Sequence, residues 1–380
     1  SSFPAMGTRI DIIGWGGEGM AIVNAVVGIV ARHEDMWSVF RPSSEVSQLN
    51  VAVRDAARGD GTSRCRADSA QAGPGLVVSE ETDRLLRDAL ALAEATGGAF
   101  NPLIGPLVAA WDVKAMRAAY VAGAPLPPAP CGHVVEAALR ASSWGLLSRV
   151  GERRWAMGVP GESVGGVDVP SPRLDLGGIA KGYTADACRD RAVAMGARGV
   201  LVSVGTSSVS VFGTRADGSS WRAGLRDPHG GPTSVAGVVE LPAGGMASLS
   251  TSGDNLGPLG GVGVGCAAER AAGAASDRAA GREAGAASDR RARETPRETP
   301  GGGGRIFDHH IIDPRTGYPA HAGVRQVSVV ASSGVLAEAL STALLVDPSI
   351  DVPDVVACWA RVTGATASAK VVGLVRAAQG

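Results

Sequence analysis

The spacing of apolar residues along the chain predicts four helices. The first covers Met20–Trp37, and the second begins after Ser79, whose hydroxyl is suited to cap a helix N-terminus. A third runs from Gly178 to about Met195, and a fourth covers residues 335–346. The longest apolar run lies inside the first helix and is too short to cross a bilayer.

Short runs rich in β-branched residues predict strands between these helices. Residues 3–15 are expected to form one strand, and four more are expected at 200–204, 209–213, 234–241 and 326–331. Strands in series, mixed with separate helices, favour an α+β fold over a regular βαβ repeat. Residues 51–75 show no periodicity, and we expect them to form a loop insertion.

Residues 257–304 differ in kind from the rest of the chain. GAASDR occurs twice, at 273–278 and 285–290, and two copies of RETP precede four glycines. Such a composition cannot bury enough apolar area to offset its ordering entropy, so we predict a disordered low-complexity insertion. Residues 1–256 and 305–380 are then expected to form one domain around it.

Composition and charge exclude several classes of function. A hydrophobic content of 45% with 19% charged residues is typical of a globular protein. The net charge of −1 argues against a nucleic-acid-binding surface, because phosphate binding needs a basic excess. The five cysteines are scattered, which argues against a disulfide framework or a zinc site.

No secretory signal or membrane-spanning segment is visible in the sequence. Cytoplasmic and extracytoplasmic locations therefore both stay open. Association with a membrane is expected only through an anchor that preceded Ser1 and was removed.

The segment RLDLGGIAKGYTAD (Arg173–Asp186) combines two glycines with a helix start. Gly177 and Gly178 allow a ligand to approach the backbone, and the free N–H groups of a helix N-terminus suit a phosphate. Lys181 lies one turn into the helix and could reach the same anion. The alternative is an ordinary loop-to-helix entry with a surface lysine. The pattern is not the GxGxxG of dinucleotide-binding folds.

The segment LAEALSTALL (Leu336–Leu345) places Glu338 and Thr342 four residues apart on one helical face. A carboxylate and a hydroxyl are oxygen donors of the kind that a hard cation prefers. The alternative is a solvent-facing glutamate beside a threonine that bonds back to its own helix.

Two further segments are open to more than one interpretation. In FDHHIIDPRTGYPA (Phe307–Ala320), His310 is either a satisfied core residue or a general base. Asp313 and Arg315 belong to a turn in the same segment. In GGAFNPLIGPLVAAW (Gly97–Trp111), the bend could flank a flat ring or form an ordinary hydrophobic turn.

Taken in order, six segments resemble the FAD:protein FMN transferase (ApbE) family from Met6 to about Leu345. They are MGT, GAFNP…GPL…W, DLGGIAKGY, STSGD (Ser250–Asp254), HIIDPRTG and AEALSTAL. The resemblance implies an α+β fold related to the T-fold, with the flavin bound between sub-domains.

The same resemblance implies an activity. Members of the family use Mg²⁺ to split FAD, attach FMN by a phosphoester to a threonine of a partner flavoprotein, and release AMP. FAD is then a substrate, and an acceptor flavoprotein is the expected partner. One alternative is a Mg²⁺-dependent pyrophosphatase that hydrolyses FAD to FMN and AMP. Another is an FAD-binding protein without catalysis.

The resemblance also assigns roles to residues. The expected FAD contacts are Met6, Phe40, Ala99, Phe100, Asn101, Asp175, Lys181 and Ile312. The expected metal ligands are the carbonyls of Gly178 and Ser341 and the side chains of Glu338 and Thr342. His310 matches the catalytic base, and Lys181 would neutralise charge during catalysis. The chain departs from the family pattern in four places. Phe40 replaces a tyrosine, Asn101 and Glu338 replace aspartates, and GTSS (Gly205–Ser208) stands where a Gly-Gly-Asp run is common.

Overall fold

The computed structural model describes residues 1–58, 75–122, 124–161, 163–228, 234–253 and 310–376. The expected insertion at 257–304 lies outside these residues. Within the described part of the chain, none of the helices combines the length and apolarity needed to span a bilayer.

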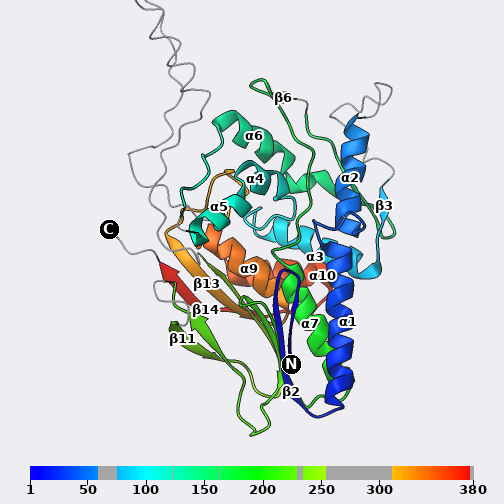
Figure 1. Ribbon diagram of the computed structural model, residues 1–380, viewed down its shortest axis with the longest axis vertical. Helices are drawn as coiled ribbons and strands as arrows, with labels where there is room; N and C mark the ends of the chain where they lie inside the picture. The colour runs from blue at the N-terminus through cyan, green and yellow to red at the C-terminus, as the bar shows by residue number, and fades with distance from the viewer. Residues whose placement is uncertain (59–74, 123, 162, 229–233, 254–309, 377–380) are drawn as a thin grey trace, which may run out of the picture.

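A seven-stranded antiparallel sheet forms the base of the molecule (Figure 1). Its strands, in spatial order, are β1 (Ser2–Ala5), β2 (Thr8–Trp15), β8 (Gly199–Val204), β9 (Ser208–Gly213), β12 (Met246–Gly253), β13 (Val324–Ala331) and β14 (Ala369–Arg376). The prediction of one strand over residues 3–15 is wrong, because Met6 and Gly7 have φ angles of 51° and 67° and close a tight hairpin turn.

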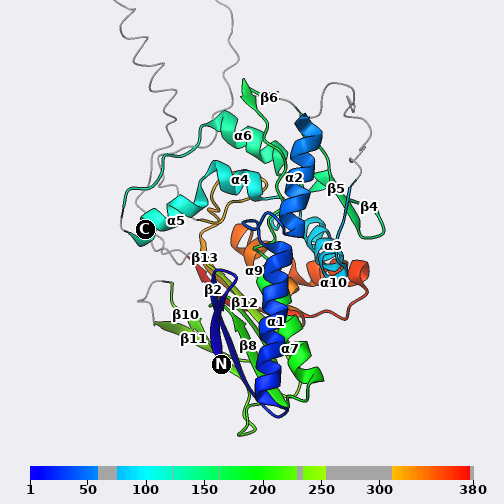
Figure 2. The same cartoon turned by 45° about the vertical axis from the view of Figure 1, so that its right-hand side comes forward.

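Each face of this sheet is covered differently. Helices α7 (Ala180–Ala194) and α9 (Gly334–Val346) pack on one face, and α1 (Gly19–Trp37) runs alongside α7 (Figure 2). The hairpin of β10 (Arg222–Arg226) and β11 (Val235–Glu240) covers the other face, where Trp221 and Leu241 join a buried cluster with sheet residues.

A second layer of helices lies above α9. Its elements are α2 (Glu45–Arg58), α3 (Glu80–Ala95), α4 (Gly105–Ala110), α5 (Val113–Val121), α6 (Gly132–Ala141), the short helix η1 (Trp144–Leu146) and α10 (Val352–Thr363). It also contains the sheet of β3 (Leu76–Val77), β5 (Arg154–Met157) and β4 (Leu147–Gly151), and the hairpin of β6 (Ser163–Val164) and β7 (Val167–Asp168). Because α9 lies between the sheet and this layer, nearly all of its residues are buried.

Two local predictions have different outcomes. The N-cap at Ser79 is confirmed, because its hydroxyl accepts the N–H of Thr82. The loop expected at 51–75 is wrong for residues 51–58, which continue α2. Val46, Leu49 and Val53 have helical spacing and are all buried, so this face packs onto the core. Residues 59–74 lie outside the described part of the chain.

Candidate functional site

Helices α7 and α9 cross with their backbones in contact. A Cβ on Gly182 would lie 2.3 Å from the carbonyl oxygen of Gly334, and a Cβ on Gly334 would lie 2.3 Å from that of Gly182. Only glycine at both positions permits this approach. The crossing brings the first turn of α7, with the glycines predicted to bind phosphate, against the side chain of Glu338.

The Glu338 carboxylate points into the first turn of α7. One of its oxygens accepts the N–H of Gly182 at 2.8 Å, and the other accepts the hydroxyl of Ser208. The ammonium of Lys181 lies 3.5 Å from this second oxygen and donates to the carbonyl of Gly177 at 2.9 Å. Glu338 is only 3% exposed, so the alternative of a solvent-facing glutamate is wrong.

This arrangement leaves the Gly178 carbonyl available. If α7 extended one turn further, the N–H of Gly182 would bond to that carbonyl, but it donates to Glu338 instead. Among the hydrogen bonds of the described residues, none ends at the Gly178 oxygen. The predicted carbonyl ligand therefore lies beside the predicted carboxylate ligand, without a competing donor.

Further hydroxyl groups lie about one turn along α9 from Glu338. The hydroxyl of Ser252 on β12 lies 2.8 Å from that of Ser341 and 3.0 Å from that of Thr342. Carbonyl, hydroxyl and carboxylate oxygens are the donors that Mg²⁺ prefers, so these residues fit a hard cation. The described residues contain no cluster of three or more His, Cys, Asp or Glu side chains, so a cation here would be held around the single carboxylate of Glu338.

Met6 lies at the tip of the β1–β2 hairpin, in a left-handed conformation that is uncommon for a residue with a side chain. Its side chain packs against two core clusters, one centred on α9 and the other between α1, α7 and the sheet. Backbone strain of this kind is often found at ligand sites, which fits the predicted contact with FAD.

The predicted bend at 99–101 supports the first turn of α7. Ala99 and Phe100 are buried, and a Cβ on Gly178 would lie 3.3 Å from the ring of Phe100. The Asn101 amide donates to the Ser142 carbonyl at 2.6 Å and accepts the N–H of Leu103 at 2.8 Å. An aspartate could not donate to Ser142, so the departure at Asn101 has a structural explanation.

Asp175 connects this bend to the glycines before α7. Its N–H donates to the carbonyl of Pro102, and its carboxylate accepts the N–H of Gly177, both at 2.8 Å.

The Ile312 side chain lies in a separate buried cluster. It is 4% exposed and packs with Leu107 and Trp111. Ile312 therefore offers little side-chain surface to a ligand.

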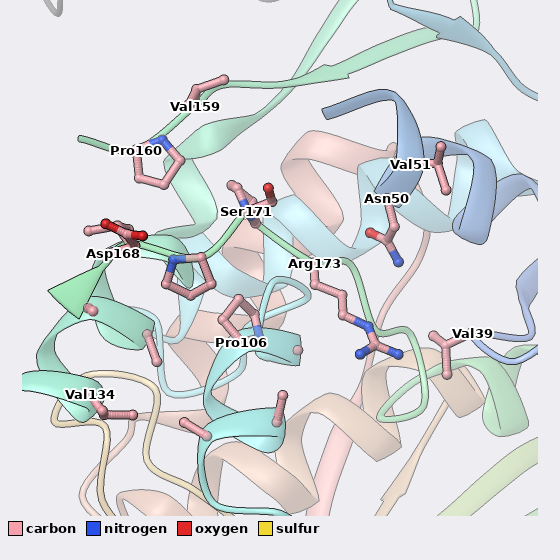
Figure 3. A pocket seen from close by; sticks show the side chains of 18 of the residues that line it. Val39, Asn50, Val51, Pro106, Val134, Val159, Pro160, Asp168, Ser171 and Arg173 are labelled. Atoms are coloured by element: carbon pink, nitrogen blue, oxygen red, sulfur yellow. The ribbon is translucent and has the colours of Figure 1, made fainter. Parts of the chain in front are cut away.

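Phe40 is 79% exposed and borders a cavity of about 1160 Å³ beneath the β6–β7 hairpin. Most residues lining the cavity are Pro, Val, Ala and Gly. Its two charged residues lie apart (Figure 3). Arg173 lies on the side of Val39 and Asn50, whereas Asp168 lies near Pro160. The Lys114 ammonium lies 5.9 Å from the centroid of the Phe40 ring.

The predicted base lies on a loop next to α4 and α5. Burial lowers the pKa of His310 to about 4, and the positive charge of Arg117 acts in the same direction. The imidazole is therefore neutral near pH 7. Arg315 bonds to Asp313 in its own loop and, at 2.7 Å, to Asp347 at the end of α9, so this pair fixes the loop against that helix.

The sequence patterns assign no role to Asp186, the last residue of RLDLGGIAKGYTAD. One carboxylate oxygen accepts the hydroxyls of Ser210 and Ser248, and the other accepts the N–H of Gly334 at 2.6 Å. Each of the two crossing helices thus has one N–H of its first turn bonded to a carboxylate of the other. Asp186 lies four residues, or about one helical turn, after Gly182, and this spacing is the sequence feature that could have identified it.

Comparison with known proteins gives consistent matches. The profile of the ApbE family matches residues 6–277 and 298–361. The FAD:protein FMN transferase of Treponema pallidum (strain Nichols) is 31% identical over 324 residues, which cover 80% of this chain and 73% of that protein. The FAD:protein FMN transferase of Rhodobacter capsulatus is 28% identical over 335 residues, 88% of this chain and 48% of that protein.

Solved structures have the same fold. The crystal structure of the ApbE protein from Thermotoga maritima matches with a TM-score of 0.62 at 22% identity, covering 100% of this chain and 96% of that one. The flavin transferase ApbE from Vibrio cholerae matches with a TM-score of 0.61 at 20% identity and the same coverage. The predicted α+β, ApbE-type fold is therefore confirmed.

Proposed function

The chain belongs to the ApbE family and is a flavin transferase, and from this we propose that it is a Mg²⁺-dependent FAD:protein FMN transferase. In the proposed reaction, the hydroxyl oxygen of a threonine on an acceptor flavoprotein attacks the FMN phosphorus of FAD. The bond to the AMP oxygen breaks, AMP leaves, and FMN remains on the acceptor through a phosphoester. The main structural support for this proposal is the α7–α9 crossing, where Glu338 and Lys181 meet beside the Gly178 carbonyl.

The metal would be held by the carbonyls of Gly178 and Ser341 and the side chains of Glu338 and Thr342. When bound, it would supply positive charge to offset the negative charge that develops on the diphosphate oxygens. The support for this assignment is that the donor set fits a hard cation and that Gly182 bonds to Glu338 rather than to Gly178.

We place the FAD between the sheet layer and the helical layer above it. Met6 supports this position because it packs against core clusters from both layers. Asp175 and the 99–101 bend lie where Gly177 and Gly178 precede α7, and the diphosphate would lie against this turn, near the Lys181 ammonium. Phe40 would contact the flavin nucleotide from the rim of the cavity.

His310 would take the proton of the acceptor threonine, because a hydroxyl is a poor nucleophile until a base removes its proton. Its low pKa keeps the ring unprotonated before the reaction, while the same burial makes it a weaker base than an exposed histidine. Lys181 would bind the diphosphate at the N-terminus of α7 and neutralise part of its charge.

The test is an incubation of the purified chain with FAD, Mg²⁺ and a flavoprotein acceptor that carries a target threonine. A fluorescent acceptor band in a denaturing gel, together with AMP, is the expected result. AMP and free FMN without a labelled band would instead indicate a pyrophosphatase. Bound FAD without either product would indicate a binding protein and refute the proposal.

Replacing the base gives a sharper test. His310→Ala should lower the labelling rate by about a hundredfold or more, the usual loss for a general base, with FAD binding nearly unchanged. His321→Ala, a substitution at a histidine close by in the chain, is the matched control and should label at the wild-type rate. A fully active His310→Ala enzyme would rule out this base.

A further inference from the structure

The charge next to the Glu338 carboxylate is that of Lys181. Among the described residues, Lys181 is its only ion-pair partner, with 3.5 Å between the ammonium and one carboxylate oxygen. The glutamate side chain is almost fully buried, whereas that of Lys181 is 29% exposed. A buried carboxylate is stable only with a compensating charge or donors, and here Lys181 supplies the charge.

The position of the ammonium matters as much as its charge. It lies between Glu338 and the Gly177 carbonyl, to which it donates at 2.9 Å, and Gly178 is the next residue in the chain. A divalent ion held by the Gly178 carbonyl and by Glu338 would therefore lie next to this ammonium. Two cations at such a distance repel, so they cannot share the same carboxylate oxygen favourably.

We propose that Lys181 is the resident cation of this site and that a divalent metal ion must displace its ammonium from Glu338. This inference rests on the proposed function for the identity of the metal site. The side chain of Lys181 is long and flexible, so the displaced ammonium remains near Gly177, at the N-terminus of α7. Metal binding thus releases the lysine for the diphosphate of the substrate.

The length of the Glu338 side chain is part of this competition. It reaches across the helix crossing to the N–H of Gly182, at the same first turn that carries Lys181. The carboxylate is therefore held by donors of α7 before any metal arrives. A metal ion has to compete with these donors, and Lys181 is the only charged one among the described residues.

The experiment measures Mn²⁺ binding alone, with the full-length protein and without FAD or acceptor, from the electron paramagnetic resonance signal of free Mn²⁺. Lys181→Met removes the competing charge and should tighten Mn²⁺ binding by about tenfold, a change of about 1.4 kcal/mol in the binding free energy. Lys181→Gln should tighten it similarly, which guards against a folding defect specific to one variant. Thermal unfolding of each variant confirms that it is folded.

Lys370→Met is the matched control, because it removes one lysine charge elsewhere. Ala369 and Val371 pack against the core beneath α9, so the exposed Lys370 between them points to the opposite side of the sheet. Its Mn²⁺ affinity should stay within twofold of wild type.

Unchanged or weaker Mn²⁺ binding in both folded Lys181 variants would overturn the inference, as would a wild-type protein that binds no Mn²⁺. Failure of the proposed function is a separate result. If FMN transfer is absent but the Lys181 variants bind Mn²⁺ more tightly, the competition stands and only the reaction is wrong.

Discussion

Replacing Gly182 by alanine should force α7 and α9 apart. The added Cβ would lie 2.3 Å from the carbonyl oxygen of Gly334 and 2.5 Å from its carbonyl carbon. Both are backbone atoms of a buried helix, so neither can turn aside as the end of a side chain could. Ordinary contact between such atoms begins near 3.4 Å, and the helices must therefore separate by roughly 1 Å.

The expected loss of stability has three contributions. Overpacking a core contact costs about 1–3 kcal/mol. A shift of this size also breaks the 2.8 Å hydrogen bond from Gly182 to the Glu338 carboxylate, which is worth about 1.5–3 kcal/mol. Alanine returns about 1 kcal/mol through its higher helix propensity. The net effect is a decrease of about 1.5–5 kcal/mol in the free energy of unfolding.

Gly28→Ala is the matched control. Gly28 lies within α1, and a Cβ there would meet nothing within 4 Å. This substitution should raise the free energy of unfolding by about 0.5–1 kcal/mol, because only the propensity term applies. Denaturant unfolding followed by circular dichroism measures both variants, and Mn²⁺ titration reports on the site. If Gly182→Ala is as stable as Gly28→Ala and binds Mn²⁺ like wild type, the close crossing is refuted.

Two further predictions concern buried polar groups. Asn101→Asp places a carboxylate against the Ser142 carbonyl, so it should lower the free energy of unfolding by about 1–3 kcal/mol in denaturant melts; a neutral effect would contradict the assigned hydrogen bond. Burial lowers the pKa of His33 and of His310 from 6.5 to about 4, so the unfolded chain binds more protons in this range and stability should fall as the pH drops from 6.5 to 4. Burial raises the pKa of Asp88 from 3.8 to about 6, which opposes this loss below pH 6. Asp88→Asn should therefore steepen the acid loss in unfolding measurements at several pH values, and an unchanged slope would rule out this opposition.

Much of the local structure could be predicted because its causes are local. The cap at Ser79 and the helix over Gly19–Trp37 depend on residues within one or a few turns, and the structure has both. The motifs could also be assigned to a family in their order along the chain. The cause of the α2 helix is also local, since Val46, Leu49 and Val53 have helical spacing, but this spacing runs across residue 51, where the loop was expected to begin.

The site itself depended on contacts between distant residues. Glu338 meets Gly182 from 156 residues away, and Asp186 meets Gly334 from 148 residues away. Neither pairing leaves a periodic signal, because each arises only when two helices cross at a pair of glycines. The sequence by itself determined which oxygen donors and which lysine the chain carries. The tertiary structure alone decided that the lysine neutralises the buried carboxylate, because only the packing of α7 against α9 excludes water from it.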